Sequence, residues 1–108
     1  MAIAVLVTIP EKEAEHLATM LVQERVCAWV NIINGAKSIF WWQGKINQAE
    51  ESLLIIKTKE TLFGKLKTLI KNNHPYSVPE IVSFKMDQIN QEYLEWLNKE
   101  ANAAPFST

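Results

Sequence analysis

The chain has 108 residues, 48% of them hydrophobic and 21% charged, which indicates one globular domain and excludes a disordered chain. Its net charge of −1, with 11 Lys and Arg residues spread along the sequence, gives no basic patch for nucleic acid or an anionic membrane. The single Cys27 excludes an internal disulfide, and no apolar run approaches the ~18 residues of a membrane span, so we expect a cytoplasmic protein.

The first 25 residues predict a strand and then a helix. Residues 3–7 are all apolar, as in a central strand buried on both faces. Thr8, Pro10 and Glu11 predict the helix start, with a capping hydroxyl, a proline in the first turn and a glutamate three residues after the cap. One apolar stripe follows at helical spacing: Ala14, Leu17, Ala18, Leu21 and Val22.

Residues 28–42 and 45–58 predict two long strands joined by a turn at Gln43-Gly44. Asn34-Gly35, inside the first of them, is itself typical of a hairpin turn, so the sequence allows either an extra turn or a bulge in one long strand. We favour the bulge. Two strands of about 14 residues would each span roughly 45 Å, so this hairpin must project beyond so small a domain.

The second half predicts a helix, a strand and a short helix. The first helix begins at Thr58 or Glu60 and ends before Pro75, the last strand covers residues 79–86, and Asn90 caps the final helix. Residues 101–108 are expected to form a frayed tail. The order β, α, β, β, α, β, α predicts a single α+β domain over residues 1–108, with two helices on one face of a four-stranded antiparallel sheet, which is a ferredoxin-like fold.

Three consecutive aromatic residues, Phe40, Trp41 and Trp42, end the first hairpin strand and must point to both of its faces. A lone projecting hairpin would expose on the order of several hundred Å² of apolar surface and two unpaired edges, which soluble monomers avoid. Pairing with further copies of the chain removes both liabilities, and we favour this interpretation. The alternative is that the tryptophans fold back onto their own sheet.

Four segments of the sequence are distinctive: Ile-Phe-Trp-Trp-Gln-Gly-Lys-Ile at 39–46, Leu-Ile-Ile-Lys-Thr at 54–58, His-Pro-Tyr-Ser-Val-Pro-Glu at 74–80 and Tyr-Leu-Glu-Trp-Leu at 93–97. Together they resemble the CutA divalent-cation tolerance family, and the resemblance extends from Val5 to Leu97. The resemblance implies a ferredoxin-like subunit, a homotrimer built by strand pairing between subunits, and an architecture like that of PII signalling proteins. It also implies that Asn34-Gly35 is an irregularity within a long strand.

The family's name implies tolerance to copper and other divalent metals, so Cu(II) or another divalent cation is the expected ligand. Ligands proposed for the family are a Cys in the first strand, a Cys after the first helix and a His pair before Pro-Tyr. Here Val7, Trp29 and Asn73 replace three of these residues, which leaves His74, with Cys27 two residues before the usual site. A transition-metal site needs several converging ligands, so His74 as a helix C-cap and Cys27 as a buried apolar residue are the alternatives.

The remaining candidates, Trp42, Lys57, Tyr76 and Glu80, lie at predicted strand ends, where a trimer could gather them into clefts between subunits. A Lys and a Glu in one cleft could bind a small zwitterion or anion, or form only a structural ion pair. The leading hypothesis is a metal-responsive binding trimer. The alternatives are a PII-like ligand sensor and a structural module that binds no metal.

No motif in the sequence is specific enough to indicate an enzyme. The phosphatase chemistry found on this fold class needs an Arg-bearing phosphate cradle after the first strand, and the only arginine is Arg25. RNA-recognition domains of this fold class carry stacking aromatic residues on their central strands, and none is present there. We therefore expect a binding protein without catalytic activity.

Overall fold

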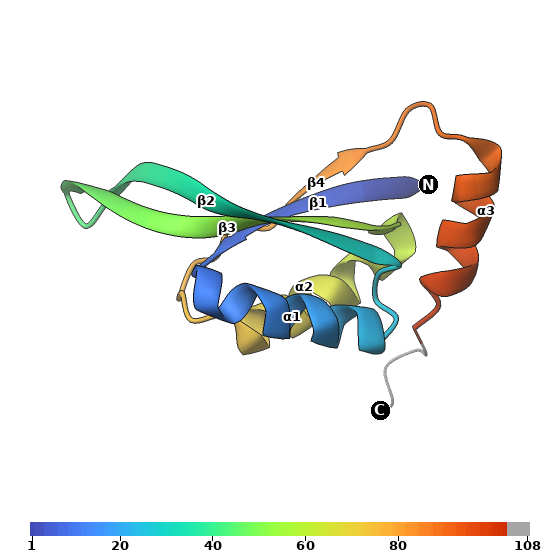
Figure 1. Cartoon of the computed structure of the whole chain (residues 1–108), viewed down its shortest axis with the longest axis horizontal. Helices are drawn as coiled ribbons and strands as arrows, with labels where there is room; N and C mark the ends of the chain where they lie inside the picture. Colours follow the sequence, from blue (N-terminus) through green and yellow to red (C-terminus); the bar gives the residue numbers. More distant parts are fainter. Residues whose placement is uncertain (104–108) are drawn as a thin grey trace.

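The computed structural model describes residues 1–103, which form four strands, three α-helices and one 3₁₀ turn (Figure 1). In chain order these are β1 (Ala2–Ile9), α1 (Glu11–Gln23), β2 (Trp29–Trp42), β3 (Lys45–Lys59), η1 (Glu60–Leu62), α2 (Phe63–Asn73), β4 (Val82–Lys85) and α3 (Gln91–Glu100). The sheet is antiparallel with the strand order β2-β3-β1-β4. Helices α1 and α2 lie on one face and α3 lies beside one end (Figure 1), which confirms the ferredoxin-like prediction.

The core lies between the sheet and the pair α1 and α2. Every second side chain of β1 and of the inner half of β3 faces the helices, because side chains alternate along a strand. Each fully buried Leu, Ile or Val stabilises the fold by about 1.5–3 kcal/mol. The largest of these core residues are Ile9, Leu17, Leu21, Leu54, Ile56, Leu66 and Ile70.

Strands β2 and β3 form one continuous hairpin that extends far beyond the rest of the sheet (Figure 1). Its single irregularity lies between Ile33 and Ala36, where Gly35 has a φ of +81°, so the predicted bulge is confirmed. Gln43 and Gly44 both have positive φ, as the two central residues of a type I′ turn require. We call the projecting part, residues 36–51, the ribbon.

Two predicted boundaries are wrong. Thr8 does not cap α1: it belongs to β1, Pro10 is the N-cap, and the Thr8 hydroxyl instead lies 3.5 Å from Oε1 of Glu80. The last strand is only four residues long, Val82–Lys85, and it pairs with β1 from Ile3 to Leu6. Val22 was also predicted to belong to the buried apolar stripe of the first helix, but it is exposed beside the last turn of α3.

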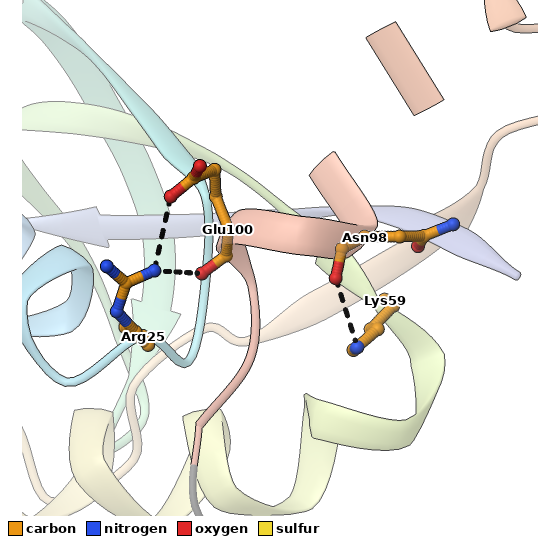
Figure 2. A network of polar contacts seen from close by, with 4 residues as sticks. All are labelled: Arg25, Lys59, Asn98 and Glu100. Atoms are coloured by element: carbon orange, nitrogen blue, oxygen red, sulfur yellow. Dashed lines mark hydrogen bonds and ion pairs between the residues drawn. The ribbon is translucent and has the colours of Figure 1, made fainter. Parts of the chain in front are cut away.

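Helix α3 is held at both ends by side chains. Asn90 caps it as predicted, accepting a hydrogen bond from the backbone N–H of Glu92 at 3.1 Å. At the other end, Nη1 of Arg25 lies 3.1 Å from Oε2 and 3.2 Å from the backbone oxygen of Glu100 (Figure 2). Lys59 donates to the carbonyl of Asn98 at 3.4 Å. Both cations lie where the helix dipole is negative, which favours this docking.

The chain after α3 stays packed for a short distance. Ala101 is fully buried and donates its N–H to the carbonyl of Leu97, and Ala103 packs against the core. Residues 101–103 are therefore ordered against the domain, unlike the predicted frayed tail, and residues 104–108 lie outside the described residues. Among residues 1–103, no helix is long and apolar enough to cross a membrane.

Candidate functional site

A hollow of about 730 Å³ lies between the ribbon and the loop that follows α2. Its volume is within the range of sites for small organic ligands. Of the four predicted cleft residues, Trp42, Tyr76 and Glu80 line this hollow, and Lys57 does not. We call it the ribbon hollow.

The ribbon supplies one wall of the hollow through strand alternation. Phe40 and Trp42 are two residues apart on β2 and so share a face, and the register places Asn47 opposite Phe40 on that face. Glu51 follows on the same face of β3, four residues after Asn47. The wall thus combines two aromatic rings with an amide and a carboxylate.

Glu51 is the most constrained polar group of the hollow. The residue is only 4% exposed, and its two carboxylate oxygens accept hydrogen bonds from the hydroxyls of Ser38 and Tyr76, the latter at 2.7 Å. Burial, followed by the hydrogen bond to Glu51 and its charge, raises the pKa of Tyr76 to about 12. Tyr76 therefore keeps its proton near neutral pH and remains a donor to Glu51.

His74 fixes the loop against β1 and leaves no nitrogen free for a metal. Its Nε2 lies 2.8 Å from the backbone oxygen of Thr8, and its Nδ1 accepts the backbone N–H of Tyr76 at 3.1 Å. Only the neutral tautomer with the proton on Nε2 satisfies both contacts, since a carbonyl can only accept. His74 is also the C-cap of α2, the alternative role considered for it.

Cys27 lies far from His74. It is buried near the start of β2, where Thr58 donates to the carbonyl of the neighbouring Val26. His74 contacts Thr8, which pairs with Leu53 on β3. Leu53 and Thr58 are five residues apart along that strand, so the His74 and Cys27 ends of the sheet are separated by about 17 Å. Burial raises the pKa of the Cys27 thiol to about 12, which disfavours the thiolate that a soft metal needs.

The two predicted metal ligands therefore do not converge within one chain. Among residues 1–103, no group of three or more His, Cys, Asp or Glu side chains is placed to hold a metal ion. A transition-metal site normally requires two or three nitrogen or sulfur ligands at one point. Residues 1–103 of a single chain therefore do not fit a copper site.

Lys57 occupies a different part of the molecule from Glu80. It lies on β3 beside α3, donates to Oδ1 of Asn31, and has its Nζ 5.5 Å from the ring centroid of Trp29. Trp29 in turn packs on Trp96 at a centroid distance of 5.7 Å. Burial lowers the pKa of Lys57. The predicted sharing of one cleft by Lys57 and Glu80 does not occur within a single chain.

Sequence reasoning missed Glu51 and its donor Ser38. One signal was available: Glu51 precedes Leu53 and Ile55 at a spacing of two, so an acidic residue interrupts one face of an otherwise apolar strand segment. Its partner Tyr76 is 25 residues away and arrives through the loop after α2, which strand periodicity does not predict.

The apolar surface of the ribbon is exposed in the single chain. Trp41 is 72% exposed, and Ile39, Phe40, Trp42 and Ile46 are also exposed, so the tryptophans do not fold back onto their own sheet. Further exposed apolar residues on β2 and β4 are Ile33, Val82 and Phe84. Because β2 and β4 are the two outer strands, each has an edge without a strand partner in residues 1–103.

Comparison with known proteins identifies relatives over nearly the whole chain. The family model "CutA1 divalent ion tolerance protein" matches residues 3–100. A Divalent-cation tolerance protein CutA from Thermus thermophilus is 47% identical over 96 residues, which cover 88% of this chain and 93% of the relative. The rice Protein CutA 1, chloroplastic, is 45% identical over 97 residues, and the match covers 89% of this chain but only 55% of that longer relative.

Solved structures agree with the sequence matches. The Cut A1 structure from Thermus thermophilus has a TM-score of 0.90 at 46% identity and covers 93% of this chain and 98% of its own. The CutA1 structure from Oryza sativa has a TM-score of 0.92 at 39% identity, covering 95% of both chains. The sheet order, the long bulged hairpin and these matches agree, and the chain belongs to the CutA1 divalent ion tolerance protein family.

Proposed function

We propose that this chain acts in divalent-cation tolerance as a cytoplasmic homotrimer of PII-like architecture that binds a small ligand at clefts between its subunits. The observation that carries the proposal is the ribbon, with its exposed Trp41, Trp42 and Ile46. A monomer would leave this surface in water, which favours association. The proposed activity is binding rather than catalysis.

Strand edges support a closed assembly. The two free edges belong to different strands, β2 and β4, so pairing them between copies is a head-to-tail contact. Contacts of this type form a ring when the rotation between copies closes, and three copies are the smallest such ring. The long edge of β2 and the exposed apolar side chains of β4 would then be covered together.

The ribbon hollow supports the ligand-binding part of the proposal. Its mouth is formed by the ribbon and the loop carrying Tyr76 and Glu80, so a neighbouring subunit that packs on the ribbon would lie beside it. This arrangement favours a PII-like sensor of a small ligand over a metal carrier. A direct Cu(II) site would need donors from more than one subunit, because His74 and Cys27 lie apart in one chain.

The test of assembly is the molar mass in solution, measured by size-exclusion chromatography with light scattering. We expect three times the 12.4 kDa of one chain. Two altered proteins should give monomer or aggregate: the double variant Trp41→Ser/Ile46→Thr, and a deletion of residues 36–46. Val22→Ser, at an exposed apolar residue of α1, serves as the matched control and should remain trimeric. A trimer that survives the deletion would refute the role of the ribbon.

The metal is tested separately by calorimetric titration of the purified protein with Cu(II). Heat above the buffer blank at micromolar copper, lost in His74→Asn, would support direct binding through His74. The absence of such heat would exclude direct copper binding at micromolar affinity. The proposed role in tolerance would then depend on sensing a small ligand.

A further inference from the structure

We infer that the ribbon hollow selects an organic cation, a small ligand with one or two ammonium groups on an apolar stem. This inference rests on the proposed function, whose ligand it names by chemical class. It is carried by the charge and the walls of the hollow together.

The charge of the hollow is negative. Glu51 and Glu80 line it from opposite sides, the ribbon and the loop after α2, and none of its lining residues within the described chain is Lys, Arg or His. The carboxylate of Glu51 is almost fully buried and is held by two neutral hydroxyls rather than by a cation. A buried carboxylate is costly without an opposite charge, so a cationic ligand gains more here than a neutral or anionic one.

Glu51 can still accept hydrogen bonds from a ligand. A carboxylate has about four lone-pair positions, and the hydroxyls of Ser38 and Tyr76 occupy one on each oxygen. An ammonium group has several donors and no acceptor, so it complements the remaining positions. Glu80 is exposed at the mouth and offers a second carboxylate.

The aromatic walls favour an organic cation over a metal ion. Phe40 and Trp42 line the hollow on the ribbon side, and a cation over an indole or phenyl face is attracted by the negative face of the ring. A divalent metal instead requires several ligands converging at one point, and the described residues contain no cluster of three acidic, His or Cys side chains that could supply them. A ligand with an apolar stem and ammonium ends can pack on the two aromatic rings and bind the two carboxylates at the same time.

Calorimetric titration of the wild-type protein at pH 7 with putrescine, a diammonium butane, tests the inference. The uncharged control ligand is 1,4-butanediol, which has the same stem. We expect saturable binding of putrescine and at least about tenfold weaker binding of the diol. Saturable binding by Cu(II) or Mg(II) without binding of putrescine, or equal binding of the diol, would overturn the inference.

Protein variants locate the binding. Glu51→Gln and Glu80→Gln should each weaken putrescine binding about tenfold or more, and Trp42→Leu should weaken it by a smaller factor. Glu50→Gln is the matched control: it removes the same charge one residue away, on the opposite face of the ribbon, where the strand register places Glu50 across from Lys37. Equal affinities of Glu80→Gln and Glu50→Gln would place any binding outside the hollow and contradict the inference.

Two further measurements separate the ways in which the test can fail. Thermal unfolding of each variant shows whether it folds, and Glu80→Gln, at an exposed carboxylate, carries the test if Glu51→Gln does not fold. Light scattering on the titrated sample reports its mass. A trimer that does not bind putrescine refutes the cation inference alone, whereas a monomer refutes the proposed assembly.

Discussion

Tyr76→Phe tests whether the buried carboxylate of Glu51 depends on its hydroxyl donors. The substitution keeps the ring and removes the hydroxyl that lies 2.7 Å from Oε2. Hydrogen bonds to charged groups contribute about 1.5–3 kcal/mol, and their loss leaves the acceptor desolvated. Tyr76 is 36% exposed, so water can partly replace the donor, and we expect a loss near the lower limit, about 1.5 kcal/mol.

A double-mutant cycle isolates the pair. In a Glu51→Gln background one carboxylate oxygen becomes an amide nitrogen, so Tyr76→Phe should then cost only about 0.5 kcal/mol, which is a coupling of about 1 kcal/mol. The assay is urea unfolding followed by tryptophan fluorescence and circular dichroism at one fixed protein concentration, because assembly makes stability concentration-dependent.

The control for the cycle is Tyr93→Phe, which removes a hydroxyl from the ring that packs on Trp29 and Trp96. It should lack coupling to Glu51, since Tyr93 belongs to α3 and does not line the hollow. Losses for Tyr76→Phe and Glu51→Gln that add within about 0.3 kcal/mol would refute the reasoning, because groups in direct contact are expected to couple.

Three further predictions follow from ionisation and backbone geometry. Because the pKa of Tyr76 is raised to about 12 in the fold, the unfolded chain loses this proton first as pH rises above 10. The stability difference between wild type and Tyr76→Phe, measured by urea unfolding, should therefore be constant below pH 10 and shrink from pH 10 towards 12; an unchanged difference at pH 11 would argue against it. Cys27, with a thiol pKa of about 12, should react with iodoacetamide at pH 8 on the order of a thousandfold more slowly in the folded than in the unfolded protein, and equal rates by mass spectrometry would contradict its burial. Arg25 has a φ of +57° and an exposed ion pair with Glu100, so Arg25→Gly should be about 1 kcal/mol more stable than Arg25→Ala, since both lose the pair but only glycine relieves the backbone strain. A glycine variant less stable than the alanine variant would show that the strain is absent.

Much of the fold could be predicted because it depends on local chemistry. Gln43-Gly44 is a turn because its two positive φ values suit the twist of a hairpin, and Asn90 caps α3 through its own side chain. Asn34-Gly35 was locally ambiguous. The pairing of β2 with β3 on both sides of Asn34-Gly35 decided in favour of the bulge, since a turn there would have separated the two halves of β2.

Side-chain partners across the fold required the tertiary structure. Lys57, Tyr76 and Glu80 were predicted to meet in a cleft between subunits because all three lie near strand ends; within one chain, Tyr76 and Glu80 line the ribbon hollow and Lys57 bonds to Asn31 instead, which the sequence does not indicate. Thr8 illustrates the same limit: its hydroxyl is a suitable helix cap by spacing, yet pairing of β1 with β3 keeps it in the strand.

The sequence by itself determined the order of the elements, the oversized aromatic hairpin and the family, because periodicity, turn residues and contiguous motifs are all encoded over a few neighbouring residues. Only the tertiary structure decided that both nitrogens of His74 are already hydrogen-bonded, that Cys27 lies at the other end of the sheet, and that Glu51 faces Tyr76. The contacts from His74 to Thr8 and from Tyr76 to Glu51 join residues 66 and 25 positions apart, and their geometry depends on the packing of the loop after α2 against β1 and the ribbon.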